Sequence, residues 1–133
     1  MSVFQPWPAH PRLRRVFVRD LVTLAHIGVY PHEMGVQQRV RLNIDFGVLD
    51  DEATQVGRDD LSRTVSYERV VHLVQRIIDE GHVRLVETLA ERIAAAVLGE
   101  SRVEIVRVRV EKLDVFSGLD SVGVEIERVQ RRG

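Results

Sequence analysis

Apolar and polar residues alternate along several stretches of the chain, as they do in a strand that buries one of its two faces. The clearest stretch, residues 40–48, has apolar side chains at every second position: Val40, Leu42, Ile44, Phe46 and Val48. Residues 16–29 and 103–113 have a similar apolar character, and residues 122–127 alternate again with glycine and glutamate. The pattern predicts four strands.

Between the second and third predicted strands the apolar residues recur at helical spacing instead. A helix is expected over residues 66–80, with Ser66 as its N-cap and Gly81 beyond its end, and a second over residues 85–98, followed by Gly99. The order of elements is then β-β-α-α-β-β. This order predicts an α+β fold, with an antiparallel four-stranded sheet and both helices on one face.

The other face of this sheet is expected to be charged. It would carry Arg41, Arg107, Arg109, Glu125 and Glu127, which can form pairs across neighbouring strands. The unit leaves both sheet edges open, and closing several units into a barrel would remove those edges. We therefore expect a homo-oligomer.

Length and composition limit the organisation and the partners. The 133 residues suit a single domain over residues 14–133, preceded by an irregular tail over residues 1–13 that contains three of the four prolines. The net charge of −1 has no basic block, so a nucleic acid partner is not expected. The sequence has no cysteine, which fits a reducing cytoplasm, and no apolar run long enough to signal membrane insertion or secretion.

Lys112 is unusual in two respects. It continues the apolar face formed by Val106, Val108 and Val110, and it is the only lysine among 19 basic residues. One interpretation is a lysine that buries its stem and extends its ammonium group to water. The alternative is proton transfer, because a desolvated ammonium group can release its proton whereas a guanidinium group cannot.

Three further residues are candidates for chemistry, and each also has an ordinary interpretation. Glu87 lies in the first turn of the second predicted helix, where the helix dipole stabilises a carboxylate. The alternative is that its carboxylate accepts hydrogen bonds from two N–H groups of a planar heterocycle. Glu33 would by default be a solvated loop acid, and Tyr67 a core aromatic with its hydroxyl group in water.

Common cofactor and metal motifs are missing from the sequence. The five histidines form no recognisable ligand spacing: His10, His26, His32, His72 and His82. There is no Walker-type loop, no G-x-G-x-x-G loop and no nucleophile elbow. We therefore expect neither a metal ion nor a cofactor.

Four motifs, in order and spacing, resemble the dihydroneopterin aldolase family of folate biosynthesis. They are IGVYPHE (27–33), TVSYERV (64–70), LVETLAERIA (85–94), and VRVEK (108–112) with DSVGVEIER (120–128). The resemblance extends over residues 14–129. It implies the tunnelling fold, in which β-β-α-α-β-β subunits form rings, typically tetramers stacked as octamers, with active sites between subunits.

The resemblance also implies an activity and roles for individual residues. Family members cleave 7,8-dihydroneopterin into 6-hydroxymethyl-7,8-dihydropterin and glycolaldehyde by a retro-aldol reaction that uses neither metal nor Schiff base. Glu87 resembles the pterin anchor, assisted by the backbone of Val86, and Lys112 resembles the general acid/base. Tyr67, from a neighbouring subunit, resembles the tyrosine that moves protons, and Glu33 the carboxylate that meets the side-chain hydroxyl groups.

The chain departs from the family pattern at two places. Leu113 follows Lys112, where many aldolases have proline, and lysine followed by leucine also occurs in dihydroneopterin triphosphate epimerases. Many members have histidine directly before the first glycine, where this chain has Ile27. Two alternatives to aldolase therefore stay open: a 2′-epimerase, and a non-catalytic oligomer that binds pterins or purines.

Overall fold

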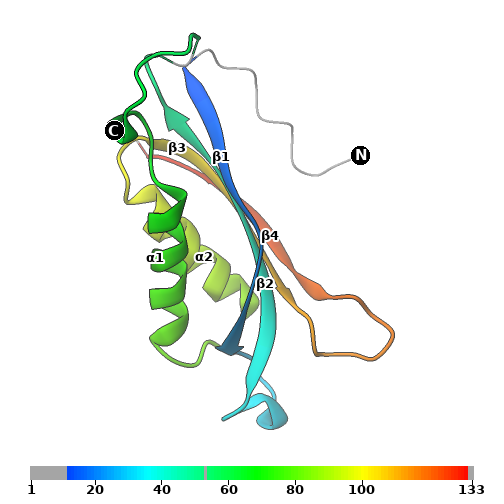
Figure 1. The fold of residues 1–133 in the computed structure, drawn as a ribbon. Helices are drawn as coiled ribbons and strands as arrows, with labels where there is room; N and C mark the ends of the chain where they lie inside the picture. The colour runs from blue at the N-terminus through cyan, green and yellow to red at the C-terminus, as the bar shows by residue number, and fades with distance from the viewer. Residues whose placement is uncertain (1–11, 53, 132–133) are drawn as a thin grey trace.

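The computed structural model describes residues 12–52 and 54–131, which form an antiparallel sheet with two helices on one of its faces (Figure 1). The strands are β1 (Leu13–His26), β2 (Gln37–Leu49), β3 (Val103–Lys112) and β4 (Val122–Val129). The helices are α1 (Tyr67–Asp79) and α2 (Val86–Leu98), with short 3₁₀ turns η1 (Pro31–Glu33) and η2 (Leu61–Arg63). The strand order in the sheet is β1-β2-β3-β4, which confirms the predicted topology.

The largest difference from the expected boundaries concerns β1, which was predicted over residues 16–29. It ends at His26 because Gly28 adopts a positive φ of 136°, which turns the chain out of the sheet. Ile27 instead forms a parallel bridge with Val83, in the turn between the two helices. At the other end β1 begins at Leu13, and residues 1–11 of the expected tail lie outside the described residues.

The apolar alternation of the strands forms the core. Leu42 faces Val110 and Ile44 faces Val108 in the β2–β3 ladder, and all four side chains are fully buried. The helices cover this face with their own apolar stripes, whose large side chains are almost completely buried at Val70, Val74, Leu89, Ile93 and Val97. Burial of these aliphatic side chains holds the two layers together.

The face of the sheet without helices is charged, as expected. Arg41 pairs with Glu111 across β2 and β3 at 2.9 Å, and Arg107 pairs with Glu127 across β3 and β4 at 2.8 Å. Such cross-strand pairs make a polar face that does not need a second layer of apolar side chains.

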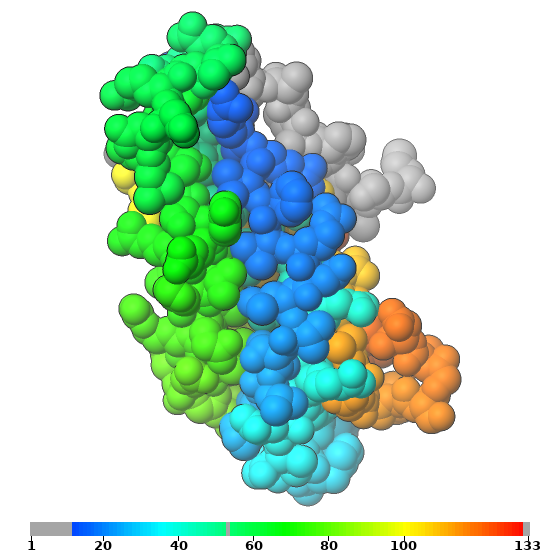
Figure 2. Space-filling view, in the orientation of Figure 1, coloured from blue at the N-terminus to red at the C-terminus, as the bar shows by residue number. Residues whose placement is uncertain are grey.

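Both edge strands lack a partner on their outer side within the described residues. Figure 2 shows β1 along the surface of the molecule in this view, with no other described segment laid over it. Phe17, Val22 and Leu24 of β1 are each about half exposed. None of the described helices is both long and apolar enough to cross a membrane.

Candidate functional site

Several chain segments meet at the end of the sheet where β1 stops and β2 starts. The backbone N–H of Gly28 donates to Val83 O at 3.0 Å, and Val83 N–H donates to His26 O at 3.0 Å. The His82 ring nitrogen Nε2 lies 2.7 Å from Gly28 O. These bonds attach the loop after β1 to the turn that begins α2, so both segments share one end of the molecule (Figure 1).

Glu33 and Lys112 form an ion pair at this end. Glu33 is only 4% exposed, so its default interpretation as a solvated loop acid is wrong. The Lys112 side chain is 13% exposed and its Nζ contacts Glu33 Oε2. The ammonium group of Lys112 therefore turns toward the carboxylate rather than extending into water.

Further donors hold the Glu33 carboxylate. Gln38 Nε2 donates to Glu33 Oε2 at 2.7 Å and lies 2.7 Å from Ile27 O, while Tyr30 N–H donates to Glu33 Oε1 at 3.3 Å. Among the residues that the structure describes, this long bond is the one that Oε1 accepts, so Oε1 retains the capacity to accept a hydrogen bond from a bound molecule.

These contacts determine the charge of Glu33. Burial by itself would raise its pKa, but hydrogen bonds from Lys112, Gln38 and the Tyr30 backbone, with the positive charge of Lys112, lower the pKa to about 2. Glu33 is thus a carboxylate at neutral pH, which accepts hydrogen bonds and cannot donate a proton. Of this pair, only Lys112 carries a proton to give.

Gly28 makes this arrangement possible. A Cβ atom at this position would lie 2.2 Å from the Glu33 carboxyl carbon, far inside van der Waals contact. Its positive φ is also unfavourable for residues with a side chain. The glycine of the motif IGVYPHE is therefore required by the position of Glu33.

The start of α2 lies at the same end of the molecule. Val86 and Glu87 are its first two residues, and Glu87 is exposed, as a first-turn acid is expected to be. An adjacent cleft of about 430 Å³ is lined by Val29, His82, Val83, Arg84, Leu85, Thr88 and Arg92. Glu87 and Lys112 do not line this cleft, but Leu85 and Thr88, on either side of Glu87 in the sequence, do.

Tyr67 lies at the opposite end of α1. The 13 residues of α1 extend about 20 Å at 1.5 Å per residue, and its C-terminal end is the one that leads to Val83 and the site. Tyr67 is 65% exposed, so its interpretation as a core aromatic is wrong. One chain therefore brings Glu33 and Lys112 into contact and places Val86 and Glu87 nearby, but it keeps Tyr67 away.

Sequence reasoning missed three residues that build the site: Gly28, Gln38 and His82. Gly28 could have been noticed because a glycine just after an apolar strand indicates a special backbone conformation. Gln38 and His82 gave no such signal, because their roles depend on contacts with backbone oxygens of a distant segment. No group of three or more possible metal ligands occurs in the described part of the chain.

Comparisons with known proteins give a consistent result. The family model for dihydroneopterin aldolase matches residues 16–127. A dihydroneopterin aldolase of Streptomyces coelicolor is 39% identical over 116 residues, covering 86% of this chain and 96% of that protein.

Solved structures of dihydroneopterin aldolases are also similar to this chain. The dihydroneopterin aldolase of E. coli in complex with neopterin has a TM-score of 0.77 and 28% identity, covering 86% of this chain and 98% of that chain. The dihydroneopterin aldolase of Burkholderia thailendensis bound to guanine has a TM-score of 0.76 and 33% identity, covering 90% and 93%. A dihydroneopterin triphosphate 2′-epimerase of Pseudomonas aeruginosa is less similar, with 24% identity over 87% of this chain and 93% of that protein.

The ion pair predicts a specific dependence of stability on pH. The pKa of Glu33 lies near 2 in the folded protein, below its usual value of 4.5, so its stabilising effect is complete above pH 4.5 and is lost as the pH falls toward 2. We expect Glu33→Gln to be less stable than the wild type at pH 6, with the difference shrinking between pH 4.5 and 2. Urea unfolding at constant ionic strength measures this difference, and a gap that stays constant over that range would contradict the assignment.

Proposed function

We propose that this chain, which belongs to the dihydroneopterin aldolase family, cleaves 7,8-dihydroneopterin into 6-hydroxymethyl-7,8-dihydropterin and glycolaldehyde. This is a carbon–carbon lyase reaction of folate biosynthesis. The observation that carries the proposal is the buried pair of Lys112 and Glu33. In it the single lysine of the chain meets a carboxylate that is ionised at neutral pH, and both residues belong to the motifs that resemble the family.

The reaction needs proton transfer and an electron sink. A base removes the proton of the side-chain hydroxyl group at C2′, the C1′–C2′ bond breaks, and glycolaldehyde leaves as the carbonyl product. The electron pair of the broken bond moves into the dihydropterin ring, and a proton returned to C1′ completes the hydroxymethyl product. Because the ring itself takes up the electron pair, positioned acid and base groups are enough and no metal or cofactor is required.

Lys112 and Glu33 suit two different parts of this task. We assign both proton steps at the reacting side chain to Lys112. Its ammonium group gives a proton to the ring nitrogen as the electron pair moves into the ring, and the amine so formed takes the proton of the C2′ hydroxyl group. Glu33 is assigned to accept hydrogen bonds from the substrate hydroxyl groups, for which Oε1 has capacity. The ion pair also keeps the Lys112 side chain in one orientation.

Glu87 is assigned to anchor the pterin. Its carboxylate would accept hydrogen bonds from the amino group and N3 of the ring, and the backbone of Val86 would add a further contact. Its exposure at the start of α2, beside the cleft lined by Val29 and Leu85, supports this assignment. An apolar cleft next to a carboxylate suits a flat heterocycle.

We further propose a homo-oligomer in which Tyr67 of one subunit completes the site of its neighbour. Two observations support it: Tyr67 is exposed, and a helix length separates it from Lys112 in the same chain. Ring closure would pair the open edge of β1 with the open edge of β4 and form a barrel. A tetramer, or two tetramers stacked as an octamer in the cytoplasm, is the assembly we propose.

The direct test is to incubate the purified protein with 7,8-dihydroneopterin and to measure glycolaldehyde and the hydroxymethyl pterin. We expect both products in equal amounts, without added metal and in the presence of a chelator. Binding of the pterin without product would contradict the enzyme assignment and favour the non-catalytic alternative. Conversion of the triphosphate to its 2′-epimer, without cleavage of dihydroneopterin, would favour the epimerase.

A second prediction separates the roles of Lys112 and Glu87. Lys112→Arg keeps the positive charge but cannot release a proton, so we expect it to lose most of its turnover while pterin affinity changes little. Glu87→Ala should instead weaken pterin binding by about 1.5–3 kcal/mol, which is typical of a hydrogen bond to a charged group. Calorimetry and single-turnover rates give the two quantities, and near-normal turnover of Lys112→Arg would remove its proton-transfer role.

The shared site predicts complementation between inactive variants. Lys112→Ala and Tyr67→Phe subunits should each be inactive alone, whereas co-expressed hybrids should contain sites with Lys112 from one subunit and Tyr67 from the next. Random pairing around a ring restores about a quarter of the sites. Activity of hybrids that stays at the level of the single variants would contradict a site shared between subunits.

A further inference from the structure

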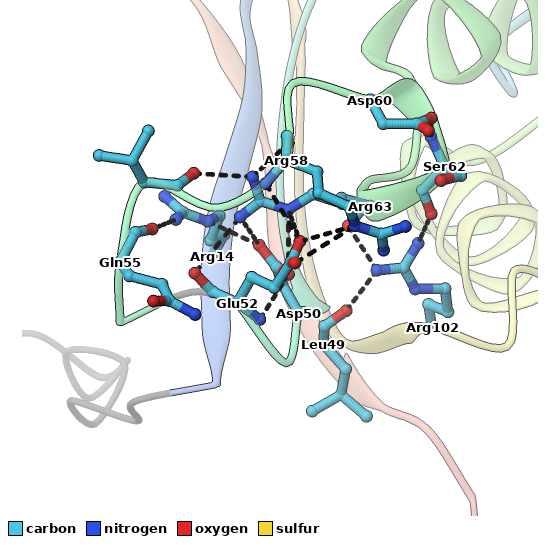
Figure 3. Close-up of polar contacts among 11 residues, drawn as sticks. Arg14, Leu49, Asp50, Glu52, Gln55, Arg58, Asp60, Ser62, Arg63 and Arg102 are labelled. Atoms are coloured by element: carbon cyan, nitrogen blue, oxygen red, sulfur yellow. Dashed lines mark hydrogen bonds and ion pairs between the residues drawn. The ribbon is translucent and has the colours of Figure 1, made fainter.

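The connection between β2 and α1, residues 50–66, is built around two arginine side chains. Figure 3 shows Arg63 and Arg102 surrounded by carboxylate and carbonyl oxygens of this connection and of the end of β2. Arg63 belongs to the connection itself, and Arg102 lies in the turn between α2 and β3. We call this group the arginine clamp.

Arg63 holds the first part of the connection. Its guanidinium group bonds to Asp50 Oδ2 at 2.9 Å and to Glu52 Oε2 at 2.8 Å, and it donates to the backbone oxygens of Val56 at 2.8 Å and Arg58 at 2.6 Å. A Cβ atom on the intervening Gly57 would lie 2.6 Å from the guanidinium carbon. The loop is therefore wrapped tightly around this one side chain, which is only 13% exposed.

Asp50 is the buried carboxylate to which Arg63 of the clamp binds. It is almost completely buried at the end of β2. Its carboxylate accepts a hydrogen bond from Arg14 Nε at 2.8 Å and another from the backbone N–H of Glu52 at 3.0 Å. Burial would raise its pKa, but the hydrogen bonds from Arg63, Glu52 and Arg14 lower the pKa to about 2. The clamp therefore stays ionised throughout the neutral range.

Arg102 holds the second part of the connection. Its side chain donates to Leu49 O at 2.8 Å and also contacts the backbone oxygens of Ser62 and Arg63. The backbone oxygen of Arg102 accepts from Leu49 N–H at 2.9 Å. This arginine thus joins the last turn of the connection to the edge of the core formed by β2 and β3.

The part of the clamp in this connection ends at Arg63, four positions before Tyr67. Only Thr64, Val65 and Ser66 separate Arg63 from this residue, and Val65 is buried. Within the described residues, Ser66 makes no side-chain capping bond to α1, and the Tyr67 side chain has no hydrogen bond or ring contact. The position of Tyr67 is therefore set by its backbone, which the connection holds on one side and the buried Val70 of α1 holds on the other.

We propose that Arg63 and Arg102 are positioning residues that hold Tyr67 for the site of the neighbouring subunit. This inference rests on the proposed function, since it assumes that Tyr67 works in a shared site. A displacement of about 1 Å in a group that moves a proton can cost roughly 100-fold in rate. Two arginines are suited to the task because several N–H donors per side chain fix several backbone oxygens at once.

The test uses complementation, because a merely structural defect would not follow the same pattern. Arg63→Ala should lower turnover at least roughly tenfold, and hybrids with Lys112→Ala should recover about a quarter of the wild-type activity. Recovery requires that the Arg63→Ala subunit still folds, assembles and supplies an intact Lys112 site. Hybrids of Arg63→Ala with Tyr67→Phe should recover nothing, because both defects affect the same contribution.

Arg58→Ala is the matched control, since the Arg58 side chain lies in the same loop and pairs with Glu52 but is 69% exposed. It should retain wild-type turnover. If Arg63→Ala does not fold, Arg63→Lys keeps the charge and loses the fork of donors, and the same pattern is expected from it.

Each outcome decides the inference. Normal turnover of Arg63→Ala or Arg63→Lys, or recovery with Tyr67→Phe instead of Lys112→Ala, would overturn the positioning role. Failure of Arg63→Ala hybrids, in an experiment where Tyr67→Phe and Lys112→Ala complement each other, would overturn it and leave the shared site intact. Failure of that reference pair would overturn the shared site and the positioning role together.

Discussion

The contact between Lys112 and Glu33 joins residues 79 positions apart in the sequence, and the site depends on it. Removing two charges from water is costly, and their attraction offsets the cost only when further hydrogen bonds complete the pair. Gln38 and the Tyr30 backbone supply those bonds, and Gly28 leaves the necessary space. Such an arrangement is weak evidence for stability alone. Asp50 and Glu111 are also buried but pair with arginine, whereas Glu33 pairs with the single lysine of the chain, and this difference favours a chemical role.

The arrangement of the two layers imposes a second constraint. Since α1 leads into the turn that begins α2, the start of α1 and the start of α2 lie a helix length apart. No adjustment of side chains could bring Tyr67 to Lys112 within one chain. A fold of this kind can use Tyr67 in its site only by association with another copy, and the open edges of β1 and β4 are where a sheet can be extended.

The fold could be predicted almost completely from the sequence, whereas the site could be predicted only in part. Alternation in β2 and β3 and helical spacing in α1 and α2 are local signals, and the observed elements follow them. The end of β1 was misplaced because its apolar character continues through Ile27 while Gly28 redirects the backbone. The burial of Glu33 and the exposure of Tyr67 contradicted their default interpretations. Glu33 is buried because it contacts Lys112, which is distant in the sequence, and Tyr67 is exposed because no distant part of the described chain packs over it.

The use of one lysine beside 18 arginines can also be explained physically. Arg63 and Arg102 each bind several oxygens of the β2–α1 connection, a task that needs many fixed donors and a charge that is never lost. Lys112 occupies a place where the partner is one carboxylate and the useful property is a proton that can leave. Substituting arginine at this position would add donors that no contact of the site requires and would remove the one property that proton transfer needs. The choice of basic residue therefore separates the part of the molecule that holds backbone in place from the part to which we assign the chemistry.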